Sequence, residues 1–230
     1  MKRKLIIIGL STTASQVYDF VTGYDLFEVV GFAVNREYKT DNKFCGLPVY
    51  ETETLEEVFD IHEIRIFVAL LWNRLNADRR KLYEDMKARG FTFANLISPS
   101  AVIRGNLAGD NCWIHDYVII QTGAEIMADC MIMAFTLVGA YSKIESHCFL
   151  GTKSTVAGGC VIGRQSFVGI NCTVFDNTVV GEKCILGACT AVKRNIEDFT
   201  VVKTGENSVK TIKISEDDIE GKLLFAKNVR

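Results

Sequence analysis

The chain repeats every six residues between Val102 and Val192. Sixteen positions in step are apolar, and fifteen of them are branched aliphatic: Val102, Ala108, Ile114, Ile120, Ile126, Ile132, Val138, Ile144, Leu150, Val156, Ile162, Val168, Val174, Val180, Leu186 and Val192. A period of six fits neither an α-helix, at about 3.6, nor a strand, at about 2. It predicts a parallel β-helix, in which each hexad supplies one short strand and one corner and three hexads close a triangular coil.

Small residues follow most of these aliphatic positions by four residues, where the interior is crowded beside a corner. Glycine recurs one residue after seven of them, where the backbone turns tightly. Six of the eight cysteines fall on the small inward position: Cys112, Cys130, Cys148, Cys160, Cys172 and Cys184. We interpret these as small hydrophobes in a reducing compartment, without disulfides. The chain has no C-x-x-C pair, so a metal site is the remote alternative.

Residues 2–98 follow a different pattern. Short apolar runs at 4–8, 29–34 and 64–70 alternate with helical stretches at about 14–21, 55–59 and 76–88. Strands that alternate with helices predict a small Rossmann-like α/β domain with a parallel sheet. Ligands of such sheets bind beyond the carboxyl ends of the strands. We therefore expect a crevice formed by residues 9–13, 35–38 and 71–74.

Several residues of these loops are candidate contacts for a nucleotide-sugar: Gly9, Ser11, Thr12, Asn35, Asn73 and Arg74. Hydroxyls and free backbone N–H groups at a helix N-terminus suit a phosphate, although Ser11 and Thr12 fit the role of helix cap equally well. Trp72, Asn73 and Arg74 could stack on a base and hold a phosphate. An ordinary exposed loop is the favoured interpretation of that segment.

The six-residue period does not continue into the C-terminal residues 199–230. Residues 199–214 predict an irregular strand and residues 215–227 a helix, and together these cap the coil, as solenoids require. The predicted domains are therefore 1–98, 99–198 and 199–230. Lys and Arg number 26 against 28 Asp and Glu, for a net charge of −2. This balance argues against a nucleic-acid or membrane surface, and we expect a soluble, cytoplasmic protein.

A Rossmann-like unit joined to a hexapeptide β-helix resembles the bacterial sugar acyltransferases that modify sialic acids, bacillosamine and related nucleotide-linked sugars. The resemblance covers nearly the whole chain and includes the segments 45–49, 75–79, 97–101, 146–150 and 167–171. It implies a left-handed β-helix, a homotrimer and acetyl-CoA bound along the β-helix between subunits. It also implies a nucleotide-sugar held by the N-terminal domain, and a histidine that acts as general base.

The implied cofactor contacts in this sequence are Gly139, Gly151, Lys153, Gly169 and Asn171. The corner glycines would let the cofactor lie against the backbone. No metal is implied.

The sequence differs from the family at the position of the general base. The family segment resembles His-Ile-Gly-His-His-Ser-Lys-Ile, and here residues 137–144 read Leu-Val-Gly-Ala-Tyr-Ser-Lys-Ile, so Ala140 occupies the base position. Tyr141 and His147 are the weak catalytic candidates that remain. Tyrosine titrates near 10 and is a poor base at neutral pH. His147 follows the Ile144 position by three residues, so we expect it at a solvent-exposed corner different from that of Ala140.

The sequence as a whole favours an acyl-CoA-dependent transferase that acts on the amine of a nucleotide-linked amino sugar in surface-glycan biosynthesis. We expect the acyl-CoA to be acetyl-CoA. The alternative is a non-catalytic homologue that binds a nucleotide-sugar or serves as an assembly subunit. The missing histidine favours this alternative. A nucleotidyltransferase is disfavoured because the first loop lacks the glycine- and arginine-rich pattern of such enzymes.

Overall fold

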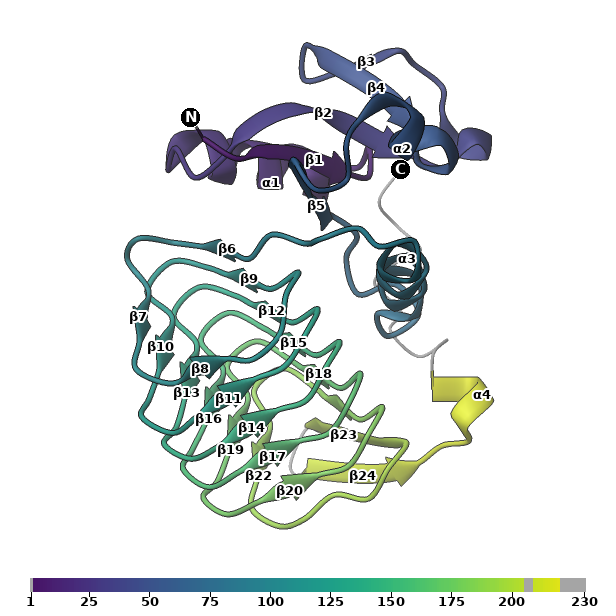
Figure 1. Ribbon diagram of the computed structural model, residues 1–230. Helices are drawn as coiled ribbons and strands as arrows, with labels where there is room; N and C mark the ends of the chain where they lie inside the picture. The colour runs from purple at the N-terminus through teal and green to yellow at the C-terminus, as the bar shows by residue number, and fades with distance from the viewer. Residues whose placement is uncertain (1, 205–208, 220–230) are drawn as a thin grey trace. The chain divides into compact units, whose positions relative to one another are not determined.

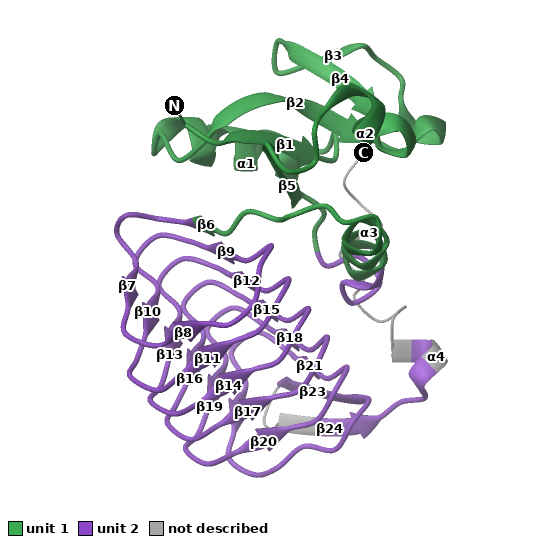
Figure 2. Ribbon diagram, viewed as in Figure 1, with its two compact units in different colours: residues 1–71, 78–96 green, residues 72–77, 97–230 purple. Residues whose placement is uncertain are grey.

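The computed structural model describes residues 2–204 and 209–219 (Figure 1). The chain divides into two compact units, one of residues 1–71 and 78–96, and one of residues 72–77 and 97–230 (Figure 2). The six residues 72–77 thus lie within the second unit, although the chain on both sides of them belongs to the first. Below, we call residues 72–77 the strap.

The first unit contains the predicted parallel sheet. Strand order is β3-β4-β2-β1-β5, and β1 pairs in parallel with both β2 and β5. The elements are β1 (Lys4–Ile8), α1 (Thr12–Gly23), β2 (Glu28–Val34), a 3-10 turn η1 (Arg36–Tyr38), β3 (Lys43–Phe44), β4 (Leu47–Glu51), a 3-10 turn η2 (Thr52–Thr54), α2 (Leu55–Val58), β5 (Ile64–Val68) and α3 (Ala77–Ala88). The Rossmann-like α/β arrangement expected from the sequence is confirmed.

The β3–β4 hairpin was not expected from the sequence. Cys45 and Gly46 form its turn with φ of 48° and 79°, and β3 is antiparallel to β4. β4 then pairs in parallel with β2, which extends the sheet by two strands. Pro48 and the two-residue length of β3 hide this hairpin from a reading based on apolar runs.

The second unit is a left-handed β-helix of two-residue strands (Figure 1). Between residues 113 and 192 paired strands are eighteen residues apart, as Ile132 and Leu150 are, so three hexads make one coil. The first face contains β7 (Val102–Ile103), β10 (Ile119–Ile120), β13 (Leu137–Val138), β16 (Thr155–Val156), β19 (Thr173–Val174) and β22 (Ala191–Val192). The second contains β8 (Asn106–Leu107), β11 (Glu125–Ile126), β14 (Lys143–Ile144), β17 (Val161–Ile162) and β20 (Val179–Val180).

The third face contains the short β6 (Leu96–Ile97), β9 (Trp113–Ile114), β12 (Met131–Ile132), β15 (Phe149–Leu150), β18 (Phe167–Val168) and β21 (Ile185–Leu186). It continues into β23 (Thr200–Thr204), which pairs in parallel with β21, and then into the antiparallel β24 (Val209–Lys213). This hairpin closes the coil where an irregular strand was predicted. The helix α4 (Glu216–Ile219) begins where a helix was expected, and the rest of that predicted helix lies outside the described residues.

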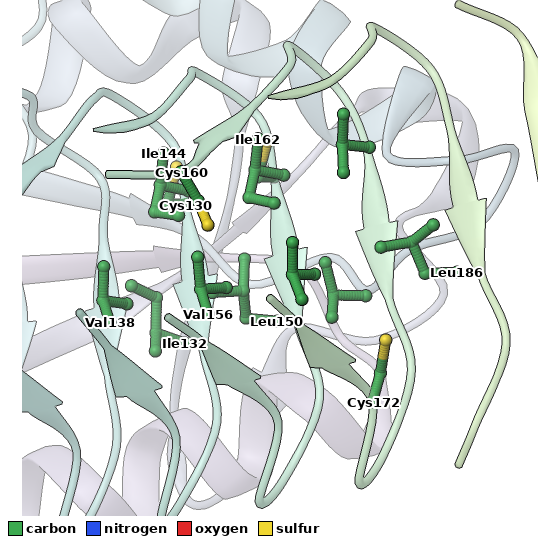
Figure 3. Packing of buried hydrophobic residues seen from close by; sticks show 14 of the residues in the cluster. Cys130, Ile132, Val138, Ile144, Leu150, Val156, Cys160, Ile162, Cys172 and Leu186 are labelled. Atoms are coloured by element: carbon green, nitrogen blue, oxygen red, sulfur yellow. The ribbon is translucent and has the colours of Figure 1, made fainter. Parts of the chain in front are cut away.

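The aliphatic positions from Ile114 to Val192 form the core of the β-helix (Figure 3). All of them are buried. The prediction is wrong in the first coil, where Val102 and Ala108 are exposed and Ile103 and Leu107 pack against the core instead. The reason is register: Ile103 pairs with Ile120 and Leu107 with Ile126. Ile103 and Leu107 are four residues apart, whereas their partners Ile120 and Ile126 are six apart, so the period of six holds only from Ile114 onward.

The small inward residues have a polar role that the sequence analysis missed. Cys130 donates its thiol to the carbonyl of Glu145 at 3.2 Å, and Ser142 donates to the carbonyl of Ala157 at 2.7 Å. In each case the acceptor lies fifteen residues later, in the next coil. Cysteine, serine and threonine share this position because each is small and each carries a donor for a corner carbonyl. The six inward cysteines are buried, as predicted, and five of them also donate their thiols to backbone carbonyls.

Candidate functional site

The corners of the β-helix form three columns of residues spaced by eighteen. Every sixth residue from 111 to 189 has a left-handed backbone, with φ between 50° and 72°. One column contains Asn111, Asp129, His147, Gln165 and Lys183; a second contains Tyr117, Phe135, Lys153, Asn171 and Cys189; a third contains Gly123, Tyr141, Gly159 and Asn177. Side chains of one column lie one above another, so each column could form a site that extends over several coils.

The first column contains a chain of buried hydrogen bonds. Asn111 donates from Nδ2 to one oxygen of Asp129 at 2.6 Å, and His147 Nδ1 lies 2.8 Å from the other oxygen. Asn111 and Asp129 are fully buried, and His147 is only 4% exposed. The backbone carbonyl of His147 also accepts a hydrogen bond from Nδ2 of Asn76, at 2.6 Å. Side chain and backbone of His147 are therefore both fixed by neighbours.

The prediction that His147 occupies a solvent-exposed corner is wrong. Asn76 belongs to the strap, which covers this corner, and no feature of the hexad pattern indicates that cover. The histidine does lie on a different corner from Ala140, as expected from the register. Its burial and its bond to Asp129 suit a residue that holds structure in place. A general base must instead reach a substrate proton within about 3 Å.

The corner of Ala140 is open and has no histidine. The Ala140 backbone N–H donates to Oε1 of Gln121 at 3.0 Å. Tyr141 is 75% exposed, and its ring lies against Gly123, where a Cβ would come within 2.4 Å of the ring. Tyr141 is thus well placed to touch a ligand at this corner.

One carboxylate, missed in the sequence analysis, shares the column of Ala140. Asp176 lies thirty-six residues after Ala140, two coils along, and it accepts the backbone N–H of Gly158 at 3.0 Å. A period of eighteen measured from Ala140 would have found it. Asp176 is exposed, so it could accept a proton through water, although it lies two coils from the family base position.

The predicted cofactor contacts fall on two corners. Lys153 and Asn171 are exposed neighbours in the second column, and Gly151 and Gly169 begin the turns that carry them. Gly139 begins the turn of Ala140 and Tyr141 instead.

Each of these glycines is required by coil stacking alone. A Cβ on Gly139 would lie 2.5 Å from the backbone of Ala157, and one on Gly169 would lie 2.6 Å from the backbone of Ala188. Close packing between coils therefore explains these glycines without any ligand.

The predicted nucleotide-sugar contacts of the first unit lie beyond adjacent strand ends. Ile8 pairs with both Ala33 and Val68, and the N–H of Gly9 bonds to the carbonyl of Ala33 at 2.8 Å. The loops after β1 and β2 therefore start at the same sheet edge. Ser11 is the N-cap residue of α1, but its side chain makes no capping hydrogen bond.

The loop after β2 is fixed by residues that follow β4. Asn35 accepts a hydrogen bond from Thr52 at 2.8 Å, and the Glu53 carboxylate accepts the backbone N–H of Arg36 at 3.1 Å. Arg36 also pairs with Glu51 at 2.7 Å, and this contact raises the pKa of the guanidinium and lowers the pKa of the carboxyl. The Asn35 amide oxygen is therefore already engaged, and its NH₂ group is the part that suits a ligand.

The remaining two predicted contacts, Asn73 and Arg74, are exposed residues of the strap. Their neighbour Trp72 packs edge-on against Phe149 of the β-helix, with ring centroids 4.6 Å apart. Trp72 is therefore used for packing within the second unit, and the suggestion that it stacks on a base is not supported.

Residues 2–204 and 209–219 were searched for membrane-spanning helices and for metal-binding groups. No helix there is long and apolar enough to cross a membrane. No group of three or more His, Cys, Asp or Glu side chains in these ranges is arranged to hold a metal ion.

The solved structures that resemble this chain include an acetyltransferase domain and a perosamine N-acetyltransferase. The acetyltransferase domain of PglB from Neisseria gonorrhoeae, in complex with acetyl coenzyme A, is 21% identical, with a TM-score of 0.78 over 92% of this chain and 100% of that chain. A histidine-to-asparagine mutant of perosamine N-acetyltransferase from Caulobacter crescentus, in complex with CoA and GDP-perosamine, is 25% identical. Its TM-score is 0.79 over 90% of this chain and 96% of that one.

WeeI from Acinetobacter baumannii is 13% identical, with a TM-score of 0.61 over 90% of this chain and 99% of that chain. No protein-family model and no curated protein sequence matches the chain. The likeness therefore confirms the predicted fold resemblance over nearly the whole chain, from the α/β unit through the β-helix.

Proposed function

We propose that this protein transfers an acyl group from an acyl-CoA, by preference acetyl-CoA, to the amine of a nucleotide-linked amino sugar. The observation that carries the proposal is the likeness to perosamine N-acetyltransferase, which spans both units and reaches a TM-score of 0.79. That protein was crystallised with CoA and GDP-perosamine, so the same two-unit architecture accommodates both classes of ligand there. Surface-glycan biosynthesis is the pathway that such a product would serve.

The chemistry proposed for the Ala140 corner needs no strong base. The neutral amine nitrogen attacks the thioester carbonyl, the carbon–sulfur bond breaks, CoA leaves as the thiol or thiolate, and the amine proton passes to water. An amine with a pKa near 8, like an α-amino group, is partly neutral at cellular pH. Positioning of the two reactants can then supply several kcal/mol of the barrier. Tyr141 is the side chain that we place against the acceptor at this corner.

Cofactor contacts are proposed at Gly139, Gly151, Lys153, Gly169 and Asn171. Lys153 and Asn171 suit this role because they are exposed on successive coils, where an ammonium group could pair with a CoA phosphate. Nucleotide-sugar contacts are proposed at Gly9, Ser11, Thr12, Asn35, Asn73 and Arg74.

Loss of a histidine is compatible with ligand binding in a relative. A histidine-to-alanine mutant of the Caulobacter enzyme was also crystallised with CoA and GDP-perosamine. Alanine at position 140 here is therefore no argument against binding, whatever its effect on rate.

The direct test of the proposal is release of free CoA from acetyl-CoA in the presence of GDP-, UDP- and dTDP-linked amino sugars. We expect release with at least one amino sugar and an N-acetylated product by mass spectrometry. A product acetylated on a hydroxyl would contradict the amine mechanism, because an alcohol needs a base to remove its proton during attack.

The second candidate function is a binding or assembly subunit without chemistry, and the absence of a histidine at Ala140 favours it. This alternative shares the ligands and differs only in turnover. Binding of a nucleotide-sugar and acetyl-CoA without CoA release, at enzyme concentrations that would reveal one turnover, would establish the alternative.

A homotrimer is the proposed assembly. Exposed apolar residues on the first face and its preceding corner support it: Tyr117 and Phe135 stack with ring centroids 4.9 Å apart while 58% and 54% exposed, and Ile119 lies beside them at 42%. Such a cluster on a rigid sheet is typical of a surface that another protein covers. Light scattering should give about three times 25.6 kDa, and a monomer at micromolar concentration would exclude both the trimer and a cofactor site between subunits.

A further inference from the structure

We propose that Gln121 is a further catalytic residue, whose side-chain NH₂ group donates a hydrogen bond to the carbonyl oxygen of the acyl-CoA thioester at the Ala140 corner. This inference rests on the proposed function and deepens it. It assigns to that corner a group that stabilises negative charge, where alanine occupies the position of the base.

Gln121 and Ala140 lie on neighbouring coils of the β-helix. Gln121 follows β10 and Ala140 lies two residues after β13, and these strands pair in parallel, with Ile120 beside Val138 (Figure 1). The backbone N–H of Gln121 donates to the carbonyl of Val138 at 2.9 Å, so the backbone of Gln121 is fixed to the coil that carries Ala140. Gln121 is exposed. All four residues belong to the second unit, so their arrangement is a property of the β-helix alone.

The side-chain amide of Gln121 is held in one orientation. Its Oε1 accepts the backbone N–H of Ala140 at 3.0 Å. A backbone N–H can only donate, so the amide atom that faces it must be the oxygen, and Nε2 lies on the other side of the amide group. The two N–H groups of Nε2 are the donors that this bond leaves for a ligand. Because the amide is fixed before a ligand arrives, less side-chain entropy is lost on binding.

The proposed reaction brings the thioester to the same corner. Tyr141 follows Ala140 directly, and the proposed function places the acceptor amine against its exposed ring. The amine nitrogen and the thioester carbon must approach within about 3–3.5 Å to react. The carbonyl oxygen is bonded to that carbon, so it must lie close to Ala140, whose N–H holds the amide of Gln121.

Negative charge develops on this oxygen during the transfer. The amine nitrogen forms a bond to the carbonyl carbon, and the π electrons of the C=O bond move to the oxygen. The resulting ammonium group loses its proton to water. The C=O bond then re-forms while the C–S bond breaks, and CoA leaves as a thiolate. A donor fixed at the oxyanion lowers the barrier to these steps without removing a proton, so it is compatible with alanine at position 140.

Gln121→Glu separates the donor role from the structural role of this side chain. Glutamate keeps the length of the side chain and an oxygen for the Ala140 N–H, but the ionised carboxylate has no donor. We expect kcat for acetyl transfer by the full chain to fall about 10²–10³-fold, the usual cost of losing one oxyanion donor. The dissociation constant of acetyl-CoA, measured by calorimetry, should rise by less than about tenfold, because the ground state of the thioester is neutral. The midpoint of thermal unfolding should not change.

Asn195→Asp is the matched control. The Oδ1 atom of Asn195 accepts the backbone N–H of Val179 at 2.9 Å, and Asn195 is exposed, so the variant makes the same exchange of amide for carboxylate at the same kind of contact. Asn195 follows β22, three coils along from β13, so it lies away from Ala140. The control should keep the kcat of the unmodified protein.

A second measurement needs no turnover. Infrared spectra of bound acetyl-CoA, labelled with carbon-13 at the thioester carbonyl, should show a lower stretching frequency with the unmodified protein than with Gln121→Glu. An unchanged kcat in Gln121→Glu would overturn the inference and leave the proposed function intact. If no amino sugar accepts an acetyl group, the proposed transfer fails. In that case a carbonyl frequency that is equal in the two proteins would overturn the inference as well, whereas a difference would support the contact between Gln121 and the thioester.

Discussion

Replacement of the buried cysteine Cys130 tests whether the inward thiols act as hydrogen-bond donors. Cys130 is fully buried, and its thiol reaches the carbonyl of Glu145 at 3.2 Å. Cys130→Ala removes the donor and leaves that carbonyl unsatisfied, a cost of about 1–3 kcal/mol in the free energy of unfolding. A small void adds to this cost.

Cys130→Ser should cost less than Cys130→Ala, about 1 kcal/mol or below. The reason is that serine already occupies the equivalent position twelve residues later, where Ser142 donates to Ala157 at 2.7 Å. Val118 and Ala124 carry no donor at this position, and the carbonyls fifteen residues later, on Met133 and Gly139, accept backbone N–H groups.

Guanidinium unfolding monitored by tryptophan fluorescence is the suitable assay. The chain has two tryptophans, Trp72 and Trp113, and both belong to the second unit. The signal therefore reports on the β-helix, without a contribution from the first unit. Cys189→Ser, at an exposed cysteine, is the control and should change stability by less than about 0.5 kcal/mol. Equal free energies of unfolding for Cys130→Ala and Cys130→Ser would refute the donor role and would show that the thiols act only as small hydrophobes.

Three further predictions concern thiols and the Ala140 corner. Burial raises the pKa of Cys172 and Cys184 from 9.0 to about 11, so these thiols ionise at lower pH in the unfolded chain than in the folded one. The free energy of unfolding should therefore fall between pH 9 and pH 11, by about 2–3 kcal/mol per thiol. A free energy of unfolding that does not change over this pH range would contradict the prediction. Native protein should react rapidly with a thiol reagent at Cys45 and Cys189 and slowly at the six buried cysteines, whereas more than two fast thiols would show an open coil. Ala140→His should change the rate of transfer to an amine by less than about tenfold, because a neutral amine attacks without a base, and a rise of about 10²–10⁴-fold would show that proton removal limits the reaction.

The β-helix could be predicted because its geometry is one-dimensional. Each residue's place inside, outside or at a corner depends only on its position in the hexad, and Ile114 to Val192 keep that position throughout. The prediction failed in the first coil because Val102 and Ala108 satisfy the same apolar pattern by coincidence. Strand pairing instead places Ile103 and Leu107 inside the β-helix. Composition alone cannot distinguish these two registers when both offer an aliphatic residue.

His147 shows why the site was harder to predict than the fold. Its corner position followed from the hexad, but its burial depends on Asn76, seventy-one residues earlier in the chain. The strap has no period and carries two of the residues, Asn73 and Arg74, that sequence assigned to an exposed loop. Nothing local to the strap predicts its three consecutive left-handed residues, Arg74, Leu75 and Asn76, either, because leucine and arginine favour other conformations and asparagine adopts this one only at single positions. Contacts with the third face of the β-helix hold that turn, so the residues that decide its shape lie outside it. Where a repeat protein receives a segment that does not repeat, the contacts between the two decide which corner residues are buried, and here the hydrogen bond from Asn76 to the carbonyl of His147 is such a contact.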